Sequence, residues 1–267
     1  MIPLKKQYEA DVAVIGGGIA GLMAAIAAAD KGARVVLLDK ANTKRSGAGA
    51  TGNDHFLCWI PEKHGDISVV YEEFMDSQNA TSNDTPLVMR FLETSPKIVN
   101  MWNDWGINMK PFGDDYEFMG HAYPGRPRIW LKYDGHNQKQ VLTRQARKEG
   151  VEILNHHPVA DLIVANGEIA GALALDISRD EPSFTVIRAK KVILATGTAN
   201  RLYPAAGSPG WPFNTAFLPG LRGRGPGAGL AHRREDGEHG DAQPPCRAEV
   251  SFARAGQVHL DRRVPLP

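Results

Sequence analysis

Apolar and polar positions over the first forty residues follow a strand–helix–strand order. Residues 11–15, in the letters DVAVI, form a short and mostly β-branched run, which is typical of a buried parallel strand. Residues 19–29 are rich in Ala, Leu and Met, which favour a helix, and Gly32 is placed to end that helix. The letters RVVLLDK then predict a second strand that ends at Asp39, so the order predicts a βαβ unit.

The pattern returns to strands in the second half of the chain. Two strand-like stretches within residues 159–178 surround Asn166-Gly167, and Asn-Gly between such stretches is a strong hairpin signal. The apolar run at 192–194 predicts one more strand. We therefore expect an α/β fold, a Rossmann-like domain with a parallel sheet, helices and a β-meander.

The middle of the chain has helical periodicity. Residues 68–105 predict helices, with Ser68 and Thr85 as candidate N-caps. Pro96 falls inside this pattern and predicts the first turn of a new helix. A further helix is expected at about 137–149.

Composition narrows the functional classes. The formal net charge of +1 indicates no attraction to nucleic acid or to anionic lipid, and no apolar run is long enough to span a bilayer. The first residues lack the apolar core of a signal peptide, so we expect a cytoplasmic protein without direct membrane insertion. Cys58 and Cys246 form no CxxC pair, and no His or Cys spacing indicates a metal site.

The turn between the first strand and the first helix carries the chemistry. Gly16, Gly18 and Gly21 have GxGxxG spacing, in which the glycines permit a tight turn, a close approach to a pyrophosphate and close helix packing. The N-terminus of the helix then points its N–H groups at the phosphates. Asp39, at the end of the second strand, can accept a hydrogen bond from a ribose hydroxyl. The motif predicts dinucleotide binding and does not by itself choose FAD over NAD.

Four segments together resemble one flavoprotein family: IGGGIAG, LLDK with RSGAGATG, VADLIVANGEIAGAL, and AKKVILATG with RLYP. The chain resembles, over residues 10–216, the fumarate reductases, succinate dehydrogenase flavoprotein subunits, aspartate oxidases and adenylylsulfate reductase α subunits. The resemblance implies FAD as the cofactor. It places the glycines at the pyrophosphate, Asp39 and Lys40 at the ribose, and Ser46 and Gly47, after Arg45, along the flavin.

The same resemblance implies further FAD contacts at Gly52, at the backbone of Ala160 on the adenine side, and at Ala195, Thr196 and Gly197. Membrane-bound members of the family attach FAD to a His that follows the Arg-Ser pair. Gly47 occupies that place here, so the resemblance implies non-covalent FAD. No catalytic residue is carried over, because the capping domain that bears them has no matching positions.

The composition changes at residue 218. Residues 218–267 contain eight Arg and no Lys, Ile, Asn, Tyr, Met, Thr or Trp. Reading the codons one nucleotide later is compatible with segments that resemble the continuation of the family. We therefore expect an FAD-binding domain at 1–217, truncated before the capping domain, and an out-of-frame, disordered tail at 218–267; a naturally disordered basic tail is the alternative. His232, His239 and Cys246 are then by-products of other codons.

Three functions follow in order of preference. The first is an FAD-dependent oxidoreductase of the fumarate reductase and adenylylsulfate reductase type, which transfers a hydride or an electron pair to or from a small anionic substrate; its candidate partner is an iron–sulfur subunit. The second is a catalytically inactive, truncated FAD-binding fragment. The third is an NAD-binding Rossmann protein, against which the glycine-rich segment after Asp39 argues.

Overall fold

The computed structural model describes residues 2–77 and 84–197. These residues divide into two units. The first contains the described parts of Met1–Ala50 and Leu142–Pro267, and the second is Thr51–Val141. The tail from residue 218 and the stretch 198–217 lie outside the described residues, as do His232, His239 and Cys246.

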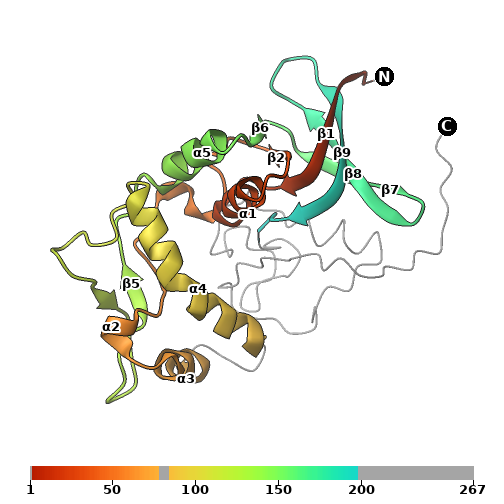
Figure 1. Cartoon of the computed structure of the whole chain (residues 1–267). Helices are drawn as coiled ribbons and strands as arrows, with labels where there is room; N and C mark the ends of the chain where they lie inside the picture. The colour runs from red at the N-terminus through yellow and green to blue at the C-terminus, as the bar shows by residue number, and fades with distance from the viewer. Residues whose placement is uncertain (1, 78–83, 198–267) are drawn as a thin grey trace, which may run out of the picture. The chain divides into compact units, whose positions relative to one another are not determined.

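The first unit is built on a six-stranded sheet (Figure 1). Its strands, in spatial order, are β6 (Glu152–Asn155), β2 (Val35–Asp39), β1 (Leu4–Ile15), β9 (Ser183–Leu194), β8 (Glu168–Asp176) and β7 (Val159–Ala165). The pairs β6–β2, β2–β1 and β1–β9 are parallel. Strands β9, β8 and β7 form an antiparallel meander. The expected α/β fold with a parallel sheet and a β-meander is confirmed.

The predicted βαβ unit forms the centre of this sheet. Strand β1 is followed by helix α1 (Ile19–Asp30) and by β2, which pairs parallel to β1 with Ile15 opposite Leu38. Gly32 has a φ of +81°, a left-handed conformation that ends the helix at little steric cost. Helix α1 buries Leu22, Ala25 and Ile26, so its apolar side packs against the strands.

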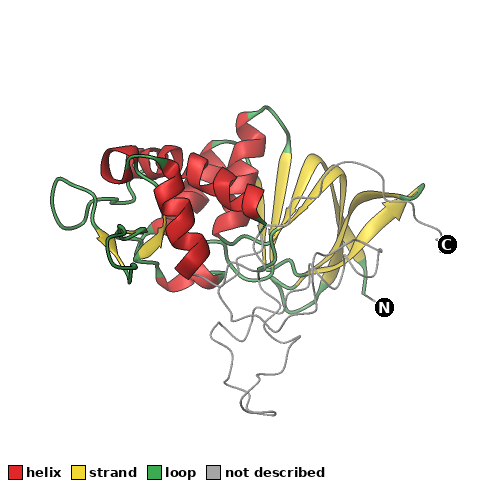
Figure 2. Cartoon of the chain, turned by 90° about the horizontal axis from the view of Figure 1, so that it is seen from below, coloured by secondary structure: helices red, strands yellow, loops and turns green. Residues whose placement is uncertain are grey.

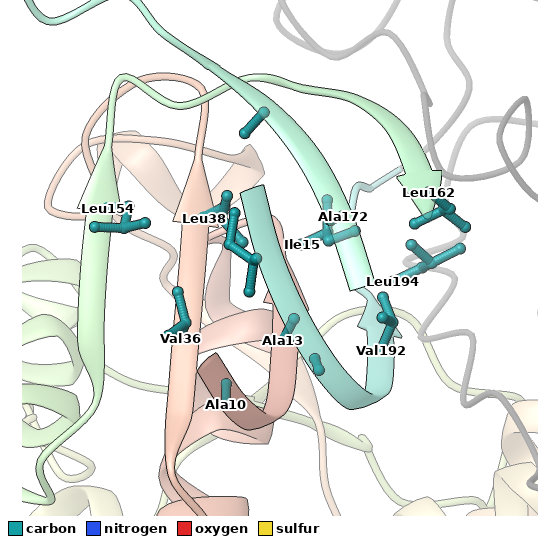
Figure 3. Close-up of a cluster of buried hydrophobic side chains, with 13 residues drawn as sticks. Ala10, Ala13, Ile15, Val36, Leu38, Leu154, Leu162, Ala172, Val192 and Leu194 are labelled. Carbon is teal, nitrogen blue, oxygen red and sulfur yellow. The ribbon is translucent and has the colours of Figure 1, made fainter. Parts of the chain in front are cut away.

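Apolar residues of neighbouring strands, most of them at alternating positions, build a continuous layer (Figure 3). Every second residue of a strand points to the same face, so neighbouring strands contribute side chains to one cluster. Figure 3 labels members from all six strands: Leu154, Val36, Leu38, Ala10, Ala13, Ile15, Val192, Leu194, Ala172 and Leu162. This layer fixes the register of the strands whose ends carry the site.

The Asn-Gly hairpin is confirmed. Asn166 and Gly167 have φ values of 53° and 81° and join β7 to β8. Positive φ at both central residues is the geometry of a type I′ turn, which matches the twist of the strands. That twist is visible where the yellow strands fan out in Figure 2.

Strand β1 is longer than its apolar pattern predicts. It begins at Leu4 rather than at residue 11, and the added residues pair with β9 alone, from Leu4 opposite Phe184 to Ala10 opposite Ala189. Most side chains before Ala10 are exposed, so this part of the strand has no hydrophobic alternation to reveal it.

The second unit combines helices with a small sheet. Its sheet has the order β3 (His55–Leu57), β5 (Trp130–Lys132) and β4 (Phe118–Met119), and all pairs are antiparallel. The helices are α2 (Pro61–His64), α3 (Ile67–Ser77) and α4 (Thr85–Asp104). A 3₁₀ turn (Ala48–Thr51) and α5 (Gln138–Lys148) cross the divisions between the units, and α5 confirms the helix expected at 137–149.

The predicted break at Pro96 is wrong, because α4 continues through Pro96 as one helix. A proline inside a helix deprives the carbonyl four residues earlier of its donor. Here the hydroxyl of Ser95 donates to that carbonyl, on Leu92, at 2.8 Å. The side chain before the proline therefore supplies the missing hydrogen bond.

The predicted N-caps are also wrong. The carboxylate of Asp66 accepts from the Ser68 N–H at 2.8 Å, and the carboxylate of Asp84 accepts from the Leu87 N–H at 3.1 Å. Each helix therefore begins beside an aspartate that lies one or two residues before the predicted cap. A carboxylate at a helix N-terminus is also favoured by the helix dipole, which a hydroxyl is not.

Candidate functional site

The glycine turn after β1 is built by close backbone approaches. Gly16 has a φ of +105°, and a Cβ at this position would lie 2.3 Å from the carbonyl oxygen of Ala195. A Cβ on Gly21 would lie 1.8 Å from the carbonyl oxygen of Gly16. Neither position can carry a side chain without moving backbone, so the turn requires glycine at both.

Gly18 stands in open space at the start of α1. A Cβ added at Gly18 would meet no atom of the described chain within 4 Å. Gly18 is the N-cap of α1, no side chain of the described residues caps this end, and the first turn holds no acidic residue. The N–H groups of the first turn and the open space above Gly18 therefore form a place that suits an anion.

Asp39 is buried beneath this turn and is already well hydrogen-bonded. Its Oδ2 accepts from the Gly17 N–H at 2.7 Å and from the Ser46 hydroxyl at 2.9 Å. Its Oδ1 accepts from the Ala41 N–H at 2.8 Å. A carboxylate has about four acceptor positions, so about one remains for a donor outside the chain.

The segment after β2 returns to the glycine turn. Gly47 has a φ of +80°, and a Cβ here would lie 3.1 Å from the Cα of Gly18. The Ser46 hydroxyl contacts Asp39 and lies 3.4 Å from the Gly17 carbonyl oxygen. Lys40 and Arg45 are exposed on the same segment. The structure therefore brings Ser46 and Gly47 against the turn.

The end of β9 forms the other wall of the turn. The Ala195 N–H donates to the Ile15 carbonyl at 2.8 Å, which continues the strand pairing past Leu194. Gly197 has a φ of +78°, a left-handed conformation that favours glycine. Ala195 is thus brought directly against Gly16 and Gly21, as the close approaches above require.

Two predicted residues lie elsewhere. Ala160 is exposed on β7, at the meander side of the first unit. Gly52 belongs to the second unit, where a Cβ would lie 3.0 Å from the Cα of His136 and 3.1 Å from the Gly135 carbonyl oxygen. Gly52 therefore allows two backbone segments of its own unit to pack closely.

The sequence does not reveal the residues that connect β6 to the site through hydrogen bonds. The side-chain oxygen of Asn155, the last residue of β6, accepts from the Thr43 N–H at 2.9 Å. The Thr43 hydroxyl is buried and forms no hydrogen bond among the described residues. The His157 N–H donates to the Asp39 carbonyl at 2.8 Å. Ligands bind at the carboxyl ends of parallel strands, so the position of Asn155 at the end of a strand is the one signal in the sequence that points to this part of the site.

The buried Asp176 on β8 connects the end of β6 to the meander. His157 Nε2 lies 3.6 Å from Asp176 Oδ2, and Lys6 Nζ lies 3.3 Å from the same oxygen. Burial alone would raise the pKa of Asp176. Hydrogen bonds from Ser178, the charge of His157 and a hydrogen bond from Lys6 outweigh it and lower the pKa of Asp176 to about 2.

Metal and thiol chemistry have little support in the part of the chain that the structure describes. Residues 2–77 and 84–197 hold no group of three or more His, Cys, Asp or Glu side chains arranged for a metal ion. Cys58 is fully buried, and burial raises the pKa of its thiol to about 12, so it stays protonated. No helix in these residues has the length and apolar character needed to cross a membrane.

Comparison with known proteins supports the interpretation of the glycine turn as part of a dinucleotide site. Residues 11–245 match the model of a family described as FAD binding domain. The chain is 28% identical over 211 residues to the fumarate reductase flavoprotein subunit of Escherichia coli, covering 73% of this chain and 33% of that protein. It is 29% identical over 220 residues to the L-aspartate oxidase of Mycobacterium leprae, covering 76% and 38%.

Solved structures give the same picture. Adenylylsulfate reductase from Archaeoglobus fulgidus superposes with a TM-score of 0.72 and 25% identity, covering 86% of this chain and 37% of that one. The chain spans between 20% and 39% of the length of eight curated relatives that it matches.

Proposed function

The chain belongs to the family of FAD binding domains, and we propose that it holds FAD non-covalently in a flavoprotein oxidoreductase that acts on a small anionic substrate. When bound, FAD supplies the group that accepts or donates an electron pair. The residues of the chain bind and orient that group.

The observation that carries the proposal is the glycine turn with its open face. The space above Gly18, the uncapped first turn of α1 and the absence of an acid in that turn fit a pyrophosphate. A side chain at Gly16 or Gly21 would collide with backbone. The close backbone contacts at Gly16 and Gly21 therefore distinguish this turn from a flexible surface loop.

At the adenosine end, we assign the ribose to Asp39. Its remaining acceptor position suits one hydroxyl donor, and the bonds from Gly17 and Ser46 fix the carboxylate under the turn. Lys40 is assigned to the same ribose, and the backbone of Ala160 to the adenine. These assignments also rest on the resemblance of the strand segments to the flavoprotein family.

At the flavin end, we assign Arg45, Ser46, Gly47 and Gly52 to the ring and its approach. Gly47 has no side chain that could form a covalent bond to the cofactor, which supports non-covalent FAD. Ala195, Thr196 and Gly197 are assigned instead to the adenosine side of FAD, over which they would close; the packing of Ala195 on Gly16 supports this assignment.

The substrate and the partner are proposed from the relatives. Several relatives are named for the reduction of fumarate, and one superposed structure is named for adenylylsulfate, so we propose a dicarboxylate or a sulfate-like anion. The proposed electron-transfer partner is an iron–sulfur subunit, and this proposal rests on the resemblance of the sequence segments to the flavoprotein family.

The test of cofactor binding uses the full chain. We expect FAD to co-elute with the chain after gel filtration and all of the flavin to stay in solution after acid precipitation of the protein. Flavin that precipitates with the protein would contradict non-covalent attachment, and a chain that never takes up FAD would contradict the proposal itself.

The test of activity uses the flavin-loaded chain with a reduced artificial electron carrier. Turnover of fumarate or adenylylsulfate supports the oxidoreductase, whereas bound flavin without turnover of either supports the alternative of a flavin-binding chain without catalysis.

A further inference from the structure

The residue beside Asp39 at the end of the sheet is Asn155. Strands β2 and β6 pair in parallel, and their last residues, Asp39 and Asn155, are partners in the register. Ligands of α/β sheets bind at the carboxyl ends of the strands, which is where both residues lie. Asn155 is therefore next to the carboxylate that we assign to the ribose, although it is not among the residues assigned to FAD.

The side chain of Asn155 holds the segment that follows Asp39. Its Oδ1 accepts from the Thr43 N–H at 2.9 Å. Thr43 is fully buried, and its methyl group lies against the glycine turn, since a Cβ added to Gly17 would be 2.5 Å from Thr43 Cγ2. The Asn155 amide thus fixes a residue that packs directly on the turn.

These contacts lead back to the Asp39 carboxylate. The N–H of Gly17, which Thr43 contacts, donates to Asp39 Oδ2 at 2.7 Å. The N–H of Ala41, two residues before Thr43, donates to Asp39 Oδ1 at 2.8 Å. A displacement of Thr43 would move both donors, so the orientation of the carboxylate depends on the hydrogen bond that Asn155 accepts.

The backbone after β6 is fixed against the same segment. The His156 N–H donates to the Ala41 carbonyl at 2.8 Å, and the His157 N–H donates to the Asp39 carbonyl at 2.8 Å. His156 has a φ of +60°, a left-handed conformation that is unfavourable for a residue with a side chain. Such strain persists only where the surrounding structure fixes it, and it is concentrated at functional sites.

We propose that Asn155 is a positioning residue for the ribose: by accepting from the Thr43 N–H, it holds the Asp39 carboxylate in the orientation that a ribose hydroxyl requires. This inference rests on the proposed FAD site and adds a residue that acts through Asp39 without contacting the cofactor. Because the effect passes through one hydrogen bond, a side chain of the same size with an acceptor at this place should preserve it.

The test compares ADP with 2′,3′-dideoxy-ADP, which share the adenine and the diphosphate and differ in the ribose hydroxyls. Binding to the full chain is measured by isothermal titration calorimetry at pH 7. We expect the unsubstituted chain to bind ADP at least about tenfold more tightly, because hydrogen bonds to a charged carboxylate are the stronger ones. In Asn155→Leu, which keeps the approximate shape and removes the acceptor, the ratio of the two affinities should fall below about twofold.

Two variants serve as controls. Asn155→Asp keeps an acceptor, and its added charge acts on both nucleotides alike, so the ratio should stay within about twofold of that of the unsubstituted chain. Asn42→Ala removes another asparagine of the same segment, whose Oδ1 accepts from the Lys44 N–H at 3.1 Å, and should also preserve the ratio. Loss of the ratio in either control would show that the Asn155 acceptor has no special role.

The same titrations separate this inference from the proposed function. An unsubstituted chain that binds neither nucleotide, or binds both equally, contradicts the assignment of the ribose to Asp39 and the inference with it. A preference for ADP that persists unchanged in Asn155→Leu contradicts the role of Asn155 alone and leaves the ribose site in place.

A second measurement covers the case in which Asn155→Leu does not fold. Amide hydrogen exchange of the unsubstituted chain is followed by NMR with and without ADP. At a free ADP concentration ten times its Kd, exchange at the Thr43 amide should slow by about tenfold, because the ligand stabilises the state in which Asn155 accepts from it. The Lys44 amide should slow by less than about twofold. Equal slowing of the two amides, or none at Thr43, overturns the proposal.

Discussion

At the scale of single residues, Asp39 is the most demanding position of the proposed FAD site. Three donors of its own chain converge on one carboxylate, and two of them, Gly17 and Ser46, come from the segments that flank the proposed pyrophosphate site. Asp39 therefore has two roles: it shapes the turn, and it offers its remaining acceptor position to the ribose.

Asp39→Asn should weaken FAD binding by about 10- to 100-fold. The substitution removes the charge and turns one acceptor into a donor, and hydrogen bonds to a charged group contribute about 1.5–3 kcal/mol each. Quenching of flavin fluorescence in a titration gives the affinity. Asp30→Asn, at the exposed end of α1, is the control and should leave the affinity unchanged. An Asp39→Asn affinity within twofold of the unsubstituted chain would contradict the assignment.

Asp176 should make stability depend on acid pH. Its folded pKa, about 2, is below its ordinary value of 3.8. Its ionised form is therefore favoured by folding, and that contribution is present above about pH 5 and is lost as the pH falls towards 2. The contribution amounts to about 2 kcal/mol.

The measurement is urea unfolding of the unsubstituted chain and of Asp176→Asn at pH 6 and pH 2. The difference in unfolding free energy between them should shrink by about 2 kcal/mol at the lower pH. Asp180→Asn, an exposed change on the following loop, should show no such dependence. A difference that stays constant with pH would show that the Asp176 carboxylate is not preferentially ionised in the fold.

At the scale of secondary structure, α4 shows how a helix accommodates a proline. The Ser95 hydroxyl donates to the Leu92 carbonyl that Pro96 cannot serve, and its oxygen accepts from the Trp59 N–H at 3.0 Å. The Ser95 side chain thus provides a hydrogen-bond partner for a backbone group of α4 and for one in the segment that precedes α2. The continuity of the helix depends on the residue before the proline.

Ser95→Ala should lower the unfolding free energy by about 1–3 kcal/mol, because it leaves a buried carbonyl and a partly buried N–H without partners. Chemical denaturation measures this loss. Thr94→Ala is the matched control: its exposed hydroxyl donates to the Arg90 carbonyl at 2.7 Å, so the change should cost less than about 0.5 kcal/mol. Equal losses in the two variants would remove the special role of Ser95.

The same scale shows which elements the sequence could predict. The βαβ unit and the Asn-Gly hairpin follow from local chemistry, since glycine positions, helix formers and β-branched runs act within a few residues. The helix caps and the continuation of α4 through Pro96 do not follow from local chemistry. Several polar residues near each helix start could serve as the cap, and only tertiary contacts choose among them.

At the scale of the whole molecule, long-range pairing was hidden from the sequence. The first part of β1 is held by β9, which follows about 180 residues later, and the three short strands of the second unit have too few residues to show alternation. Of the proposed FAD site, the glycines and Asp39 could be predicted from their spacing. Thr43 and Asn155 could not, because only the parallel pairing of β2 with β6 brings them together.

The central claim is that the glycine turn and Asp39 hold a dinucleotide rather than a flavin ring alone. The most direct test is a pair of titrations of the full chain with FAD and with FMN, which lacks the pyrophosphate linkage and the adenosine, followed by flavin fluorescence. We predict that FAD binds at least about tenfold more tightly than FMN, a difference of about 1.4 kcal/mol or more. Equal affinity for the two flavins, or no affinity for FAD, would contradict the claim.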